Sequence, residues 1–208
     1  MLLESEQLWD SVRRRLAEEW GGAWDDEAQR RMMGMNTGEW TTFMADHLGL
    51  DATPAAIEEA VVERLSALYR RSPPVLPGAV AAVRRLARRW PLAVASSSPR
   101  RLIATALDAA GLSRCFREIV SSEEVERGKP APDVFVEAAG RLGRAPGDCV
   151  AIEDSTSGLR AAVASGARVV AIPNREYPPA GDAVASAHLR LPSIAWLWPR
   201  AVERAWSG

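Results

Sequence analysis

The second half of the sequence alternates short apolar runs with segments of helical periodicity. Helical patterns over residues 77–90, 99–110, 132–142 and 156–165 are separated by the runs LAVAS, FREIVS, CVAIED and RVVAIP. Short runs of this kind between helices are typical of a parallel sheet covered by helices on both faces. We therefore predict a doubly wound α/β domain over residues 72–208. In such sheets ligands bind beyond the carboxyl ends of the strands.

Residues 5–71 show helical spacing of apolar residues throughout and no strand pattern. Breaks at 21–22 (GG), 33–38 (MGMNTG) and 49–54 (GLDATP) divide this part into separate helices. The pattern predicts a small helical domain over residues 5–71, ahead of the α/β domain.

Composition excludes several classes of protein. With 208 residues and 47% hydrophobic content, the chain can bury a sizeable core. Its formal net charge of -1 gives no reason to expect a nucleic acid or an acidic membrane surface as a partner. We find no long apolar stretch and no leader at the start, and we interpret Cys115 and Cys149 as reduced core thiols. We therefore expect a cytoplasmic protein.

Polar residues follow the first apolar run of the α/β part. In AVASSSPR, we expect Ser98 to cap the next helix, with Pro99 in its first turn. Ser96 and Ser97 then remain at a helix N-terminus, where hydroxyls and free backbone N–H groups suit an anion. Capping alone would leave these two serines unexplained.

Charged residues stand at two further strand ends. Glu153 and Asp154 are adjacent after an apolar run, which fits either an exposed pair or a site for Mg²⁺, a cation that takes oxygen ligands. Lys129 is the only lysine, against 25 arginines. It is either a solvated loop cation or a compact charge that reaches into a site closed to a guanidinium. Three such signals at successive strand ends favour a shared site.

These segments resemble a known family. LAVASSSPR, GKPAPDVF and EDSTSG, in this order and at these spacings, resemble motifs two, three and four of the haloacid dehalogenase superfamily, in particular its β-phosphoglucomutase-like phosphatase branch. That branch inserts a helical cap ahead of motif two, which matches residues 5–71. The resemblance implies a Rossmann-like core with a cap. It also implies a Mg²⁺-dependent phosphatase or phosphosugar mutase that acts on a small phosphorylated metabolite, such as a sugar phosphate, through an aspartyl-phosphate.

The resemblance also implies roles for individual residues. Ser96 would donate a hydrogen bond to the transferring phosphoryl group. Lys129 would neutralise its charge and orient the nucleophile. Ser97, through its backbone N–H, and Arg100 would add contacts to the phosphate. Such an arrangement agrees with the electrostatics of phosphoryl transfer.

The metal site implied by the resemblance is incomplete in this sequence. Asp154 would be a Mg²⁺ ligand, and Glu153 a ligand or a supporting acid. The family's first motif, a central apolar strand ending in Asp-x-Asp-Gly with the nucleophilic aspartate, does not occur in the 208 residues. Residues 1–4 are similar to the segment that leads out of that strand. We therefore expect the strand to belong directly before Met1, with a start codon misassigned inside the reading frame, and we expect the chain as written to lack phosphatase activity.

Substrate choice would lie in the cap. The turn over residues 30–40 approaches the active site in this family when the cap closes. We therefore predict that the leaving group is read by Arg31, Asn36, Thr37 and Glu39. The methionines and the tryptophan of the same turn are expected to pack the helical domain instead.

Three other functions are considered beside the phosphatase. A haloacid dehalogenase needs no cation and would have no use for the Glu153–Asp154 pair. A catalytically silent relative that binds phosphate or a protein partner is the alternative if the start is genuine. A nucleotide-binding protein of the Rossmann type is disfavoured, because no G-x-G-x-x-G follows any strand.

Overall fold

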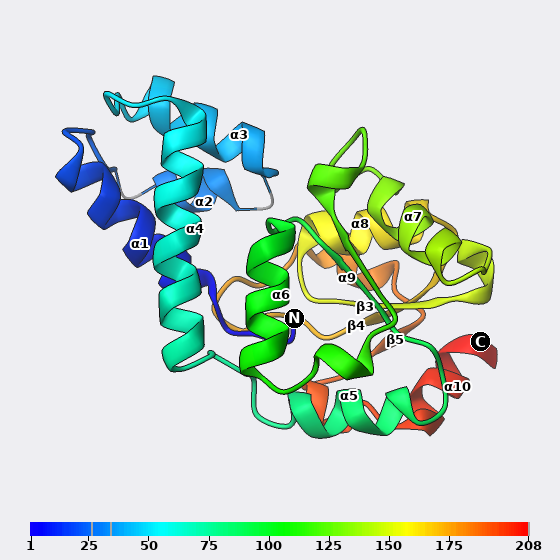
Figure 1. The fold of residues 1–208 in the computed structure, drawn as a ribbon. Helices are drawn as coiled ribbons and strands as arrows, with labels where there is room; N and C mark the ends of the chain where they lie inside the picture. Colours follow the sequence, from blue (N-terminus) through cyan, green and yellow to red (C-terminus); the bar gives the residue numbers. More distant parts are fainter. Residues whose placement is uncertain (26, 34, 208) are drawn as a thin grey trace.

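The computed structural model describes residues 1–25, 27–33 and 35–207. Its first part is helical, with α1 (Glu6–Glu19), α2 (Ala28–Met32), α3 (Thr37–Thr42), the π-helical turn η1 (Phe43–His47) and α4 (Pro54–Arg71). These helices form a lobe beside the α/β part (Figure 1). In the described ranges, no helix combines the length and apolar character that a membrane crossing requires.

Local signals explain where the helices of this lobe begin. Asn36 and Glu39 form a capping box at the start of α3. Thr53 accepts a hydrogen bond from the Ala56 N–H, and Pro54 occupies the first turn of α4. The lobe closes around Trp9 and Trp40, whose rings meet edge to face at a centroid distance of 5.8 Å. The cluster of buried side chains around them also includes Leu102 of the α/β part, so the two parts share apolar contacts.

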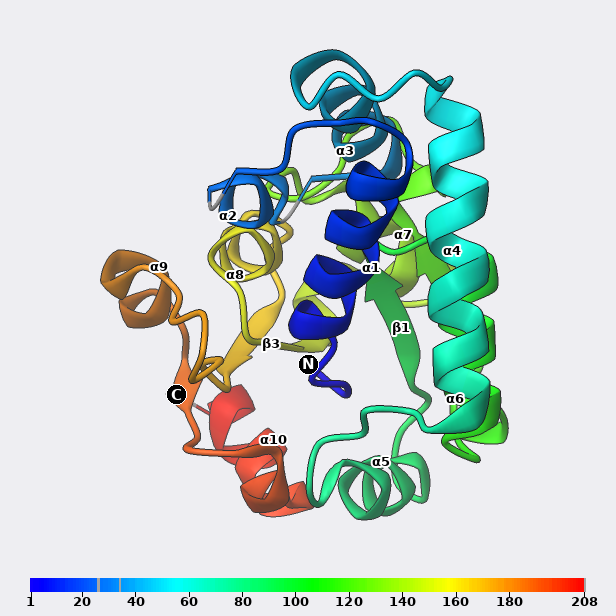
Figure 2. The same cartoon turned by 90° about the vertical axis from the view of Figure 1, so that its left-hand side faces the viewer.

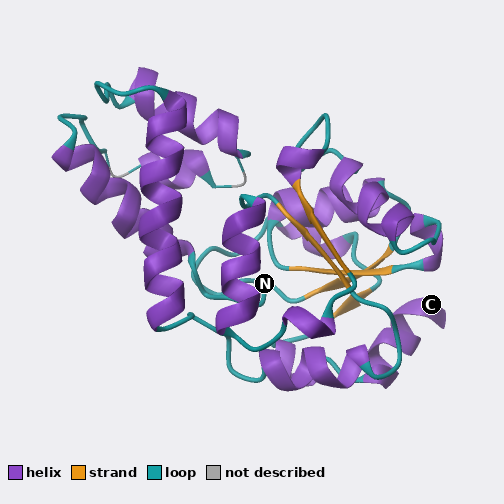
Figure 3. Cartoon of the chain, viewed as in Figure 1, coloured by secondary structure: helices purple, strands orange, loops and turns teal. Residues whose placement is uncertain are grey.

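The α/β part alternates helices and strands as the sequence predicts. Its elements are α5 (Ala79–Ala87), β1 (Ala93–Ser96), α6 (Arg100–Ala109), η2 (Ser113–Cys115), β2 (Glu118–Ser121), η3 (Ser122–Glu124), α7 (Asp133–Arg141), η4 (Pro146–Asp148), β3 (Val150–Glu153), α8 (Thr156–Ala164), β4 (Arg168–Ala171), α9 (Gly181–Ala185), β5 (Leu189–Arg190), η5 (Ile194–Trp196) and α10 (Pro199–Ser207). Helices lie on both sides of the strands (Figure 3). The predicted doubly wound α/β class is confirmed.

The strands form two parallel groups rather than one sheet. β1 pairs with β2, and β4 pairs with both β3 and β5. In the described ranges β1 and β3 do not pair, and Figure 2 shows them on either side of the N-terminal segment. A cavity of about 1830 Å³ reaches between them, lined by Ala95 of β1, Ile152 of β3 and apolar residues of α5, α6 and α7. We name the space between β1 and β3 the slot. It lies where the sequence predicts a missing central strand, and that strand stays a prediction.

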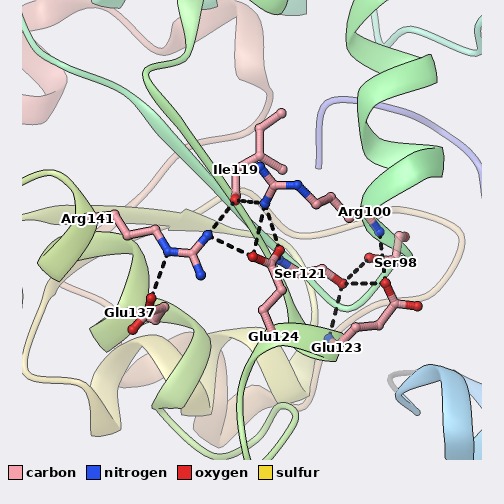
Figure 4. Close-up of polar contacts among 8 residues, drawn as sticks. All are labelled: Ser98, Arg100, Ile119, Ser121, Glu123, Glu124, Glu137 and Arg141. Atoms are coloured by element: carbon pink, nitrogen blue, oxygen red, sulfur yellow. Dashed lines mark hydrogen bonds and ion pairs between the residues drawn. The ribbon is translucent and has the colours of Figure 1, made fainter.

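One carboxylate holds the carboxyl end of β2 to its neighbours (Figure 4). Glu124 accepts hydrogen bonds from Arg100 at 2.8 Å, from Arg141 at 2.8 Å and from the Ser121 N–H at 2.9 Å. Both arginines also donate to the Ile119 carbonyl oxygen. Burial alone would raise the pKa of Glu124, but the Ser121 N–H and the two guanidinium groups lower it to about 2. Glu124 thereby fixes the start of α6 and the end of α7 against β2.

We expect Glu124→Gln to lower the free energy of unfolding by about 1 to 2 kcal/mol at neutral pH. A carboxyl group whose pKa is depressed in the folded state stabilises the protein above its unfolded pKa. This contribution should therefore disappear as the pH falls from about 4.5 towards 2. Urea unfolding of both proteins across this range measures the difference. A difference that stayed constant from pH 7 to pH 3 would contradict the assignment.

Candidate active site

Loops from three parts of the chain meet at the carboxyl ends of β1 and β3. Ser96 and Ser97 lie at the end of β1, Lys129 lies between η3 and α7, and Asp154 directly follows β3. All four line the same cavity. The structure thus brings together the polar residues that the sequence places at successive strand ends.

The Lys129 ammonium group is buried at the mouth of the slot. Its Nζ donates to the Ala95 carbonyl oxygen at 3.3 Å and forms an ion pair with Glu153. It also lies 4.7 Å from the centroid of the Phe135 ring. The Lys129 side chain is only 7% exposed. An ammonium group has three N–H donors, so two are used here and one remains for a ligand.

The Glu153 carboxylate is fully engaged with donors. Oε1 accepts from Lys129, while Oε2 accepts from the Asp154 N–H at 2.9 Å, the Ser155 N–H at 3.3 Å and the Ser155 hydroxyl at 3.2 Å. Burial alone would raise the pKa of Glu153, but Lys129 holds it well below its usual range. The Glu153 side chain is therefore a buried anion that orients Lys129 rather than an exposed carboxylate.

Asp154 carries a carboxylate that faces the cavity. Its Oδ2 lies 3.1 Å from the amino nitrogen of Met1, and its side chain is 19% exposed. Burial raises the pKa of Asp154, the Met1 amino group opposes this change, and Glu153 adds to the rise. The described residues contain no group of three or more His, Cys, Asp or Glu side chains placed to share a metal ion.

The loop after β1 is shaped by contacts from β2. The Ser96 hydroxyl accepts from the Ser98 N–H at 3.1 Å, and the Ser121 hydroxyl donates to the Ser98 carbonyl oxygen at 2.8 Å. The prediction that Ser98 caps α6 was wrong, since no side chain of this loop caps the helix. The N–H of Arg100, in the first turn of α6, donates instead to Glu123 at 3.0 Å (Figure 4).

The Arg100 side chain, predicted to contact phosphate, points elsewhere. Its guanidinium group donates to Glu124 and to the Ile119 carbonyl oxygen (Figure 4). Arg100 is absent from the described residues that line the cavity. Its position at the helix start is as predicted, but its charge is used to hold β2.

The four cap residues predicted to read the leaving group are also outside the cavity lining of the described chain. Arg31 lies 4.5 Å from the centroid of the Phe43 ring and contacts His47, so it is held within the cap. Glu39 is occupied by the capping box, in which it accepts from the Asn36 N–H at 2.8 Å. Gly34, inside the predicted turn, lies outside the described residues.

Asn36 and Thr37 instead dock the cap onto the α/β part. The Thr37 hydroxyl donates to Glu123 at 3.2 Å. Asn36 packs against Gly128, the neighbour of Lys129, where an added Cβ would lie 3.3 Å from the Asn36 Cβ. Asn36 and Thr37 therefore contact residues next to the site and do not line the cavity themselves.

The cap wall of the cavity is built from residues that the sequence did not single out as functional. It includes Trp9, Arg13, Met35, Trp40 and Tyr69. One sequence feature could have pointed to this wall. Arg13 is a charged residue four positions after Trp9 and four before Ala17, so its spacing places it on the buried face of α1.

Comparison with known proteins identifies the family to which this fold and these loops belong. A profile of the haloacid dehalogenase-like hydrolases matches residues 3–166. The chain belongs to this family.

Relatives and solved structures agree with this assignment. The chain is 33% identical to a bifunctional riboflavin kinase/FMN phosphatase of Arabidopsis thaliana over 83% of its own length, and it spans 46% of that longer protein. It is 32% identical to a probable pseudouridine-5'-phosphatase of Drosophila melanogaster, with 84% of this chain and 78% of the relative covered. The structure of a CbbY variant from Rhodobacter sphaeroides, in complex with xylulose-(1,5)bisphosphate, superposes with a TM-score of 0.85 at 27% identity, covering 97% of this chain and 94% of that one.

We expect Gly158→Ala to destabilise the protein by about 2 kcal/mol, although alanine favours helices. Gly158 lies in the first turn of α8, and an added Cβ would come 2.1 Å from the carboxyl carbon of Glu153. The carboxylate would have to move and would lose donors. Gly140→Ala in α7 is the control, because no atom lies within 4 Å of its added Cβ. Urea unfolding compares the two, and equal stabilities would show that the Glu153 position is not fixed.

Proposed function

We propose that the protein, in its catalytic form, is a Mg²⁺-dependent phosphatase for a small phosphorylated metabolite. The observation that carries this proposal is that Ser96, Lys129 and Asp154, from three separate loops, line one end of one cavity. Two relatives named as phosphatases, and a solved relative that holds a sugar bisphosphate, support the same substrate class.

Ser96 and Lys129 are suited to hold the phosphoryl group. The Ser96 oxygen accepts from the Ser98 N–H, so its own proton is free to be donated. Lys129 has one unused N–H donor in a site shielded from water, where a charge-assisted hydrogen bond is strong. Ser97 lines the cavity next to Ser96 and adds its backbone N–H. Together these donors would neutralise the oxygens of a phosphoryl group in transfer.

The metal would lie at Asp154. The described residues fit Mg²⁺ in part, because Asp154 lines the cavity with a carboxylate, and Mg²⁺ prefers oxygen ligands of this kind. Glu153 already accepts four hydrogen bonds, so we assign it to orienting Lys129 rather than to metal binding. When bound, Mg²⁺ would supply neutralising charge to the phosphate oxygens. Its remaining ligands would come from groups other than Glu153.

The nucleophile would lie on a strand inside the slot. Within the described residues the facing edges of β1 and β3 pair with no strand, and apolar side chains line the cavity beside them. Backbone N–H and C=O groups that stay unpaired in such surroundings cost about 1 to 3 kcal/mol each. Met1 lies beside Asp154, and the chain then continues to α1. A segment directly before Met1 could therefore run through the slot parallel to both strands and end at Lys129 and Asp154.

Turnover of a generic phosphate ester, with and without Mg²⁺, tests the proposal. The 208-residue chain should be inactive. A form extended before Met1 by an apolar strand ending in Asp-x-Asp-Gly should show activity that Mg²⁺ switches on and that Asp154→Asn largely removes. Magnesium-dependent turnover by the 208-residue chain would contradict the placement of the nucleophile. An inactive extended form that still binds phosphate would favour the catalytically silent alternative.

We expect Lys129→Arg in the extended form to lower kcat/KM at least about tenfold, or about 1.4 kcal/mol of transition-state stabilisation. The charge is kept, but the larger planar group must fit between Ala95, Glu153 and the Phe135 ring. Arg127→Lys is the control, because Arg127 is exposed in the same loop and pairs with Asp133. Wild-type turnover by Lys129→Arg would make Lys129 a loop cation.

A further inference from the structure

A second cation lines the same cavity from the helical lobe. Arg13, on α1, lies with its guanidinium carbon 4.4 Å from the centroid of the Trp9 ring and 4.6 Å from that of the Trp40 ring. The residue is 5% exposed. It lines the cavity that also contains Ser96 and Lys129, so positive charge stands on both the cap wall and the core wall of one chamber.

Arg13 forms no direct ion pair within the described residues, although Glu6 lines the same cavity and acts on it through space. Its Nε is buried without a hydrogen-bond partner, and Arg13 takes part in none of the ion pairs within the described residues. The acids that act on it through space are Glu6 and Asp10, of which Asp10 pairs with Arg14 at 3.3 Å. Burial lowers the pKa of Arg13 to about 9, against the effect of these two acids. Arg13 therefore remains charged at neutral pH.

The aromatic contacts do not account for the whole group. Rings of tryptophan attract a guanidinium group through their π electrons, which offsets part of the cost of burial. Within the described residues they leave the Arg13 Nε without a hydrogen-bond acceptor, and a buried charge that lacks such partners is costly. Arg30 also lines the cavity, but its side chain is 72% exposed and forms an ion pair with Glu27. Its charge is therefore solvated and paired, unlike that of Arg13.

We propose that Arg13 binds a second anionic group of the substrate, so that the preferred substrate carries a carboxylate or a second phosphate in addition to the phosphate held by Ser96 and Lys129. This proposal rests on the proposed function of the site. A carboxylate and a phosphate share the oxygen pair that a guanidinium fork recognises with two hydrogen bonds. Arg13 would thus select among phosphorylated metabolites by a charge remote from the reacting bond.

Binding of matched pairs of probes tests the proposal on the 208-residue chain, because binding needs no nucleophile. 6-Phosphogluconate and sorbitol 6-phosphate differ by a carboxylate, and fructose 1,6-bisphosphate and fructose 6-phosphate differ by a phosphate. Titration calorimetry should show that the wild type prefers the doubly anionic member of at least one pair by about 10- to 100-fold, the range for hydrogen bonds to a charged group. The pair that shows the preference identifies the anion.

Arg13→Met should reduce this preference to less than about threefold, and Arg13→Lys should restore part of it. Arg15→Met is the control, because Arg15 is exposed on the same helix and absent from the cavity lining, and it should keep the preference. Urea unfolding should show that Arg13→Met remains folded and at least as stable as the wild type, because an unpaired buried charge has been removed.

Equal affinities within both pairs in the wild type, or a preference that survives Arg13→Met, would overturn the assignment of Arg13. These outcomes are distinct from failure of the proposed function. An extended form that hydrolyses both members of each pair equally would support the phosphatase and contradict the role of Arg13. Failure of all four probes to bind to both the 208-residue chain and the extended form would overturn both.

Discussion

The arrangement of the active site depends on the buried ion pair between Lys129 and Glu153. Lys129 contacts the end of β1 through the Ala95 carbonyl oxygen and the end of β3 through Glu153, so one ammonium group spans the mouth of the slot. Such pairs add little net stability, because desolvation offsets the attraction, but breaking one leaves a costly buried charge. The pair thus fixes the distance between the two groups of strands at the point where chemistry is proposed.

Glu153 is itself positioned by the start of α8. The absence of a side chain at Gly158 leaves room for the carboxylate, and the N–H groups of Asp154 and Ser155 meet it there. Neighbouring Asp154 is left to face the cavity. Two adjacent carboxylates therefore have different surroundings, and this difference underlies the separate roles proposed for them.

The two buried cations that line the cavity have different surroundings. Lys129 is paired within the core, whereas Arg13 is stacked on tryptophans and has no ion pair in the part of the chain that the structure describes. An ion pair holds its two side chains in a fixed position. A buried cation without such a pair is stabilised more when an anionic ligand binds to it. Because the helical lobe supplies Arg13 and the core supplies Lys129, a ligand that met both cations would bridge the two parts of the chain.

The sequence by itself determined the order of helices and strands, and it placed Ser96, Lys129 and Asp154 in the segments that follow three successive strands. These features are local, because the periodicity of apolar residues fixes each element and parallel strands end at one edge. Only the tertiary structure decided which partner each polar group finds. Glu123 rather than Ser98 meets the first turn of α6, Arg100 turns to Glu124, and Arg13 faces the cavity. Such contacts depend on segments far apart in the chain, and sequence spacing does not encode the distance between them.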